Sequence, residues 1–238
     1  MKTPDELHAE IVSPARPDET AKPEPREEPL PAPETERRDK TKPLFIIRRK
    51  PESGDSVIRD VSLESLLKRY PILRAQRGLD KTECPLLVIT EDAERIIKEH
   101  ISWGEKTEWN VREQGGLLIG QPFRVKRRVI GLVESAIPAE LTRSSAAYLE
   151  MGVDTWAKML DVFDERYSGK GLRVIGWYHT HPNGLPVFMS GTDMGTQRTF
   201  FNRPWHFAAV LNPHQKLLAC FHSAEATKCE YCPKTFTD

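Results

Sequence analysis

The segment LRVIGWYHTHPNGLPVFMSGTD, residues 172–193, is an apolar, strand-like run that ends in two histidines. Residues two apart on a β-strand project to the same face, so we expect His179 and His181 to lie side by side. Neutral imidazole nitrogen is a preferred zinc ligand, and Asp193 adds a carboxylate further along the segment. Three protein ligands with an open fourth position are typical of a catalytic zinc site. The competing interpretation of the two histidines is a pair of ordinary polar residues where a strand enters a loop.

Ser190 and Asp193 have a second interpretation. The spacing Ser-x-x-Asp before a helical stretch is typical of a capping box, with Ser190 as the N-cap and Asp193 in the first turn. The two interpretations are compatible, because a helix start would fix the Asp193 carboxylate and hold the Ser190 hydroxyl at the mouth of the site.

Hydrolysis at a zinc site also needs a general base, and a glutamate is the natural candidate. Glu108, Glu113, Glu134 and Glu150 precede the histidines. Most glutamates are solvated surface residues, so each has that alternative. Glu113 lies just before GGLLIG, whose first glycines would let another backbone approach closely. Spacing alone does not choose between Glu113 and Glu134.

The rest of the ordered sequence alternates helical and strand-like patterns, which indicates an α/β or α+β domain around one sheet. A proline at position 71 is expected to break or kink the first helix. The predicted helices are 62–77, 91–103, 144–167 and 192–201, and the predicted strands are 44–49, 85–90, 116–120, 129–135, 172–181, 205–211 and 216–222.

The N-terminal segment has a different composition. Residues 1–43 hold nine of the 19 prolines and no aromatic residue, and they show no helical or strand periodicity. Such a segment cannot bury enough apolar area to offset its ordering entropy, so we expect a disordered tail. The expected organisation is this tail, an N-terminal extension with a helix at 44–84, a catalytic domain at 85–222 and a C-terminal tail with a Cys-x-x-Cys motif at 223–238.

Composition excludes several classes of function. The 238 residues carry 35 basic and 35 acidic side chains, and this balance gives no electrostatic argument for a nucleic acid or a membrane surface as partner. No apolar run has the roughly 18 residues of a membrane span, and the N-terminus lacks the apolar core of a secretory signal. Four cysteines do not make a disulfide scaffold, so a cytoplasmic setting is expected.

Four separated elements occur in an order that resembles the JAB/MPN family of zinc peptidases, which carry the JAMM motif. They are a glutamate, GGLLIG, a strand ending in HTHP, and SGTD, and the following QRTFFNRPWHFAAVLNP is similar to the bacterial branch of the family. The resemblance implies a mixed, curved β-sheet flanked by helices and one Zn²⁺ per chain. It assigns His179, His181 and Asp193 as zinc ligands, Glu113 as general base and Ser190 as an oxyanion stabiliser.

The chain departs from the family pattern in one place. The family usually has seven residues between the second histidine and the serine, whereas PNGLPVFM supplies eight. We place the extra residue in the loop 182–186, where an insertion is tolerated most easily.

The resemblance further implies a deubiquitinase-like isopeptidase or peptidase that cleaves the amide bond at the C-terminus of a ubiquitin-like protein. Its partners would be that protein or its conjugates, and the activating and conjugating enzymes of the same system. Three alternatives remain: a catalytically silent scaffold with the same fold, a relative of DNA-repair type, and a processing peptidase for a sulfur-carrier protein.

The C-terminal cysteines form a weaker pattern. Cys220, His222, Cys229 and Cys232 have the spacing C-x-H…C-x-x-C, which offers four ligands for a second, structural zinc. The alternative, which we favour, is that Cys220 is a small core residue and CEYC a terminal loop. His214 is expected in the turn between the last two predicted strands.

Overall fold

The computed structural model describes residues 58–75, 79–140 and 153–232. Contacts divide the chain into Met1–Pro43 and Leu44–Asp238, and every described residue belongs to the second unit. The predicted tail at 1–43, the predicted strand at 44–49 and the start of the predicted helix at 144–167 lie outside the described residues. Within the described ranges, no helix has the length and apolar character needed to cross a membrane.

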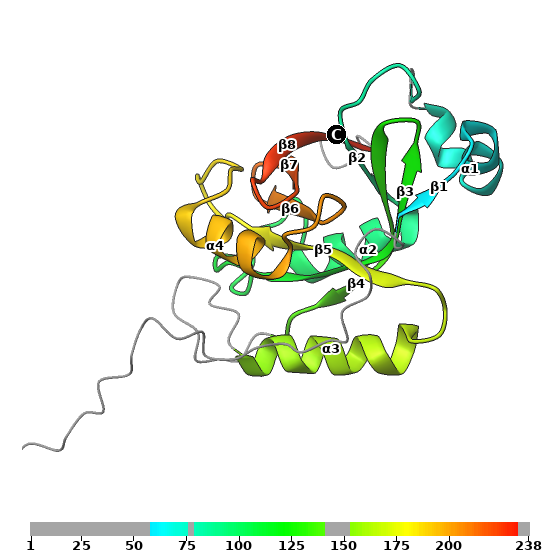
Figure 1. Cartoon of the computed structure of the whole chain (residues 1–238). Coiled ribbons are helices and arrows are strands. Elements are labelled where there is room, and N and C mark those ends of the chain that lie inside the picture. Colours follow the sequence, from blue (N-terminus) through cyan, green and yellow to red (C-terminus); the bar gives the residue numbers. More distant parts are fainter. Residues whose placement is uncertain (1–57, 76–78, 141–152, 233–238) are drawn as a thin grey trace, which may run out of the picture. The chain divides into compact units, whose positions relative to one another are not determined.

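The described residues form a mixed α/β fold of four α-helices and one eight-stranded sheet, which confirms the predicted fold class (Figure 1). The helices are α1 (Leu63–Arg69), α2 (Glu91–Ile101), α3 (Val153–Tyr167) and α4 (Gly191–Phe200), with the 3-10 turn η1 (Pro71–Ala75) after α1. The strands are β1 (Arg59–Asp60), β2 (Leu86–Ile89), β3 (Gly115–Val125), β4 (Arg128–Pro138), β5 (Arg173–Thr180), β6 (Phe207–Asn212), β7 (Leu217–His222) and β8 (Thr227–Cys232).

The sheet is mixed and curves onto itself. Its order is β1-β3-β4-β2-β8-β7-β6-β5, and β5 pairs again with β3. Strands β5 and β6 run parallel, as do β2 and its neighbours β4 and β8, whereas the hairpin pairs are antiparallel. The closing pair β3–β5 places Gly115 opposite His179. The start of β3 therefore lies beside the end of the strand that carries the histidines.

Local signals explain the helix ends. The Ser62 side chain caps α1, and Pro71 begins the 3-10 turn that follows it, as expected for a residue that cannot continue an α-helix. The Thr90 side chain caps α2, which ends at Ser102 in the left-handed conformation. These residues fix where each helix meets the sheet.

Three apolar clusters hold the layers together. Alternating residues of β2 face opposite sides: Leu87 and Ile89 pack with α2, whereas Leu86 and Val88 pack with α1 and the segment after it. The third cluster joins α3 to β3, β4 and β5, and it includes Trp177. Figure 1 shows α3 running along one side of the sheet, with α1 at the end where β1 meets β3.

Gly116 is required by the close approach of the strands around β3. A Cβ atom there would lie 2.3 Å from the carbonyl oxygen of Ile137 and 2.6 Å from the ring of Tyr178. Only glycine fits such spacing. The prediction that the glycines of GGLLIG admit a neighbouring backbone is thus confirmed at Gly116.

The segment CEYC is not a terminal loop, which corrects our expectation. Residues 229–232 belong to β8, which pairs with β7 on one side and with β2 on the other. The strand forms because Cys229 and Cys232 are buried on the two sides of the sheet, Cys229 with the α2 cluster and Cys232 with the α1 cluster.

Candidate metal centre

Two elements bring the predicted ligands together. His179 lies near the end of β5, His181 is the first residue after that strand, and Asp193 lies in the first turn of α4. Backbone bonds fix the strand end on both sides: the Thr180 N–H donates to the Gln114 carbonyl at 2.8 Å, and the His181 N–H donates to the Leu211 carbonyl at 2.8 Å. The histidines are therefore held by β3 and β6 at once.

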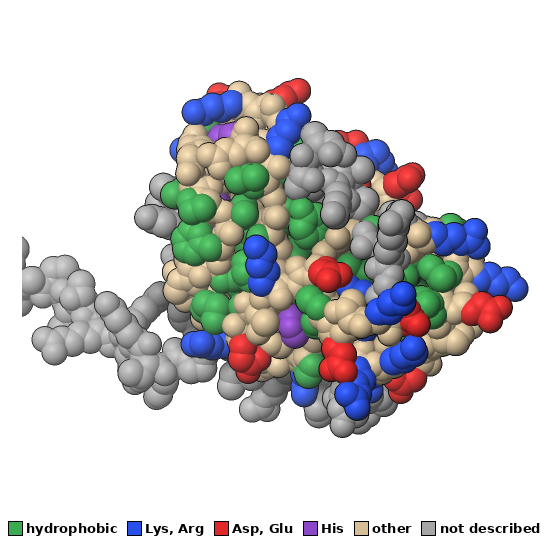
Figure 2. All heavy atoms as spheres, turned by 90° about the horizontal axis from the view of Figure 1, so that it is seen from above, with side chains coloured by type: hydrophobic (Ala, Val, Ile, Leu, Met, Phe, Trp, Pro, Cys, Tyr) green, Lys and Arg blue, Asp and Glu red, His purple; other side chains and the backbone are tan. Residues whose placement is uncertain are grey.

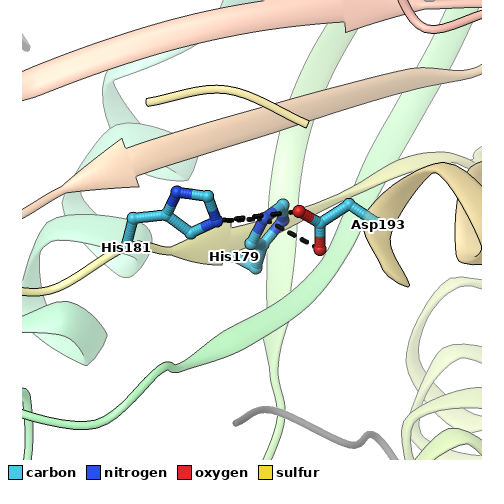
Figure 3. A group of neighbouring side chains, drawn as sticks. All are labelled: His179, His181 and Asp193. Carbon is cyan, nitrogen blue, oxygen red and sulfur yellow. Dashed lines mark hydrogen bonds and ion pairs between the residues drawn. The ribbon is translucent and has the colours of Figure 1, made fainter. Parts of the chain in front are cut away.

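The three side chains converge on one point (Figure 3). His179 Nε2 lies 3.3 Å from His181 Nε2 and 3.3 Å from Asp193 Oδ1, and His181 Nε2 lies 3.6 Å from Asp193 Oδ2. Ligand atoms bound at about 2.0–2.1 Å in tetrahedral geometry are about 3.3–3.4 Å apart. With one atom from each residue, the three ligand atoms lie within 4.8 Å of one another, so the donor set fits a single zinc ion with a position left for another ligand.

Neighbouring groups fix the orientation of both imidazoles. His181 Nδ1–H donates to the carbonyl of Pro186 at 2.8 Å, so Nε2 is the nitrogen that faces the cluster. The His179 ring stacks on the Trp177 indole, with ring centroids 4.5 Å apart and planes at 14°. Trp177 Nε1–H in turn donates to the buried Gln197 of α4 at 2.7 Å. The hydrogen bond of His181 is typical of a ligating histidine, whereas His179 Nδ1 is buried without a hydrogen-bond partner among the described residues.

The electrostatics of the cluster favour a charged carboxylate. Burial raises the pKa of the Asp193 carboxyl, but the hydrogen bonds from His179 and His181 outweigh burial and hold that pKa well below its usual range. Burial lowers the pKa of His181, but its hydrogen bond with Asp193 and the charge of that carboxylate leave the pKa raised. An anionic group facing two imidazoles is an arrangement that a divalent cation would stabilise.

Ser190 and Asp193 form the capping box that the spacing indicates. The Ser190 N–H donates to Asp193 Oδ2 at 2.7 Å, and the Asp193 N–H donates to Ser190 Oγ at 3.3 Å. The Ser190 hydroxyl also hydrogen-bonds the Asp193 carboxylate and helps to lower its pKa. Capping and a role at the metal centre are thus compatible in the structure.

The surroundings of Glu113 and Glu134, the two candidates that spacing alone does not distinguish, differ in the structure. Glu113 is two residues before Gly115, the partner of His179 in the sheet, and its charge acts on His181. Glu134 binds instead to Gln121 Nε2 at 2.7 Å and to the Tyr70 hydroxyl at 3.3 Å. Glu108 is exposed, and Glu150 lies outside the described residues. Among the described candidates, Glu113 is the one whose backbone and charge adjoin the histidines.

The structure does not bring the C-terminal set together. Cys220 and Cys229 face each other across β7 and β8, whereas Cys232 lies on the other side of the sheet. The His-His-Asp cluster is the only group of three or more metal-ligating side chains within the ranges described. Burial raises the pKa of the Cys220 and Cys229 thiols, which disfavours the thiolate form. The geometry therefore favours core cysteines.

Exposed apolar side chains flank the metal centre. Trp109, Val111, Leu185 and Phe188 are 54, 37, 48 and 46% exposed. The last two lie in the loop after His181, and the Phe188 ring is 5.1 Å from the His181 ring. The Val111 carbonyl accepts a hydrogen bond of 3.5 Å from the Asn183 side chain, so the two loops adjoin. The sequence analysis did not predict this group of exposed apolar side chains.

Comparisons with known proteins agree with the motif order. Residues 93–202 match the family model described as JAB1/Mov34/MPN/PAD-1 ubiquitin protease. Over 44 residues, the chain is 46% identical to the 26S proteasome non-ATPase regulatory subunit 14 of Drosophila melanogaster and of Caenorhabditis elegans, and 43% identical to the 26S proteasome regulatory subunit RPN11 of Eremothecium gossypii. Each of these matches covers 18% of this chain and 13% of the relative. The family match, the sheet and the order of the motifs together identify a JAB/MPN domain at residues 93–202.

Proposed function

We propose that this chain is a zinc-dependent isopeptidase or peptidase that cleaves the amide bond at the C-terminus of a ubiquitin-like protein. The observation that carries the proposal is the convergence of His179, His181 and Asp193 in a domain of a ubiquitin protease family. The exposed apolar side chains around the centre add support, because exposed apolar patches mark protein interaction sites.

The residues have distinct roles in this proposal. His179, His181 and Asp193 would hold one zinc ion. When bound, zinc supplies a Lewis acid and lowers the pKa of a water ligand to about 7. Glu113 accepts the proton of the attacking water and returns it to the leaving amine. The Ser190 hydroxyl donates a hydrogen bond to the oxygen that gains charge in the transition state.

The partial exposure of Glu113 suits a general base. Its side chain is neither buried nor fully exposed, so it can reach both solvent and the mouth of the site. The neighbouring Gln114 N–H donates to Thr180 Oγ1 at 2.8 Å, which ties the base to the strand of the histidines. Positioning of this kind is what proton transfer requires.

Surface charge gives no support to the DNA-repair alternative on the face seen in Figure 2. Acidic and basic side chains are interspersed there, and no broad area of one sign is visible. Binding of a nucleic acid depends on clustered Lys and Arg. The proposal therefore keeps protein conjugates as the substrate class.

The test uses the full chain loaded with zinc and two probes. Each probe is a ubiquitin-like protein joined through its C-terminal carboxyl to the side-chain amine of a lysine peptide. One probe is ubiquitin, and the other is a sulfur-carrier type protein. Cleavage of ubiquitin supports the isopeptidase, whereas cleavage of only the second probe identifies a processing peptidase. Bound zinc with no cleavage of either would favour the silent scaffold and overturn the proposal.

The glutamates supply a matched pair of variants for this assay. Glu113→Gln should keep zinc and lose turnover by about 10²–10⁴-fold, the usual contribution of a general acid–base group. Glu134→Gln removes the rival carboxylate, which is bound to Tyr70 and Gln121, and should leave the rate within a few-fold of wild type. The reverse pattern would show that Glu134 is the base.

A further inference from the structure

Two buried asparagines join the loops around the metal centre to the turn between β6 and β7. Asn110 follows α2 in the loop that leads to Glu113, and Asn212 ends β6. Both side chains are fully buried. Buried amides are costly unless hydrogen-bonded, so their partners show what each side chain holds in place.

Asn212 binds the turn and the loop after His181 with different atoms. Its Oδ1 accepts from the N–H groups of His214 at 3.0 Å and Gln215 at 2.9 Å. Its Nδ2 donates to the carbonyls of Asn183 at 3.1 Å and Leu185 at 2.7 Å. One side chain thus closes the turn and clamps the loop that contains the extra residue.

Asn110 holds the loop after α2 and fixes the imidazole of His214. Its Nδ2 donates to the carbonyls of Ile101 and Glu105 at 2.9 Å each, so its Oδ1 is an acceptor. His214 Nε2 lies 3.0 Å from that oxygen and must carry the hydrogen. The Asn183 N–H donates to His214 Nδ1 at 2.8 Å. His214 is therefore neutral, with its hydrogen on Nε2.

This network reaches the ligands through Pro186. The clamped carbonyl of Leu185 precedes Pro186, whose own carbonyl accepts from His181 Nδ1–H. That bond leaves Nε2 of His181 to face Asp193. Asn183 has a positive φ of 59°, an uncommon conformation that the bonds from His214 and Asn212 hold in place.

We propose that Asn110, Asn212 and His214 are positioning residues, which hold the loops on both sides of the metal centre so that His181 presents Nε2 to the metal. The inference rests on the metal role in the proposed function, but not on the substrate. None of the three residues touches the ligands, and each acts through the backbone of the loop 182–186.

Two variants remove different hydrogen bonds to the loop after His181. Asn212→Asp keeps an acceptor for the turn N–H groups and loses the donor to Asn183 and Leu185. His214→Phe keeps a ring of similar size and loses both of its bonds. We expect each variant to bind zinc about 10–100-fold more weakly in a chelator competition, as when an outer hydrogen bond to a ligand is lost. His222→Phe is the matched control, because it removes an imidazole at the end of β7, and should bind zinc as wild type does.

A spectroscopic readout keeps the test independent of turnover and of variant folding. In the ¹⁵N spectrum of wild-type imidazoles, His214 should appear as the neutral form with hydrogen on Nε2, and its Nδ1 should couple to the Asn183 amide across the hydrogen bond. A charged or rotationally averaged His214, or folded variants with unchanged zinc affinity, would overturn the inference. A protein that shows these signatures and binds zinc but cleaves neither probe would refute the proposed function alone.

Discussion

Asp193 has two tasks that a pair of substitutions can separate. Its Oδ2 accepts the Ser190 N–H at the start of α4, and its charge faces the two imidazoles. Asp193→Asn keeps an oxygen acceptor for the cap and removes the charge, whereas Asp193→Ala removes both. We expect both variants to lose zinc affinity, and only the alanine variant to lose the acceptor for the Ser190 N–H.

The two losses differ in magnitude and in assay. Loss of this one hydrogen bond should lower the unfolding free energy of the metal-free protein by about 1 kcal/mol, within the range of about 0.5–1.5 kcal/mol for a typical hydrogen bond. Loss of the charged ligand should weaken zinc binding by more than the roughly 10–100-fold that an outer-shell bond contributes. Urea unfolding measures the first effect, and competition with a zinc chelator measures the second.

A matched control removes a carboxylate at another helix start. Asp92 lies in the first turn of α2, and 82% of its side chain is exposed. Asp92→Asn should leave zinc affinity unchanged. Wild-type zinc affinity in Asp193→Asn would refute the ligand assignment, and equal stability of the asparagine and alanine variants would refute the capping role.

Three further predictions concern the oxyanion donor, the strand crossing and the buried histidine. Ser190→Ala should keep zinc and lower kcat by about 10²–10³-fold in the conjugate assay, because one transition-state hydrogen bond is lost; a wild-type kcat would remove this role. Gly116→Ala should lower the unfolding free energy by about 1–3 kcal/mol, because the new methyl group would overlap the Tyr178 ring and the Ile137 carbonyl; an unchanged urea midpoint would contradict the close packing. Burial lowers the pKa of His100 to about 4, so its unfolded form binds the proton more tightly. The unfolding free energy therefore keeps its full value above about pH 6.5. It falls as the pH is lowered towards 4, by up to about 3 kcal/mol. Urea unfolding of His100→Gln should show a shallower loss of stability over that range, and parallel curves would contradict the prediction.

The sequence predicted those parts of the site that depend on local spacing. Residues two apart on a strand share a face, which predicts that His179 and His181 lie together, and Ser-x-x-Asp before a helical stretch predicts a helix cap. The structure brings these side chains together. The ends of α1 and α2 also follow from local capping and proline signals.

Features that depend on distant strand pairing could not be predicted in the same way. Spacing alone does not choose between Glu113 and Glu134, and only the β3–β5 pairing places one of them beside the histidines. The cysteines of CEYC have a spacing that also occurs in metal sites, but residues three apart on a strand face opposite sides. Asn110 and Asn212 gave no sequence signal, because an asparagine after a helix or in a turn is ordinary until its partners are known.

X-ray absorption at the zinc edge of the full chain, loaded with one equivalent of zinc, tests the metal centre most directly. The account predicts a first shell of nitrogen and oxygen at about 2.0–2.1 Å, with the outer scattering of two imidazole rings. A shell of sulfur at about 2.3 Å would instead place the metal on the cysteines and contradict the central claim.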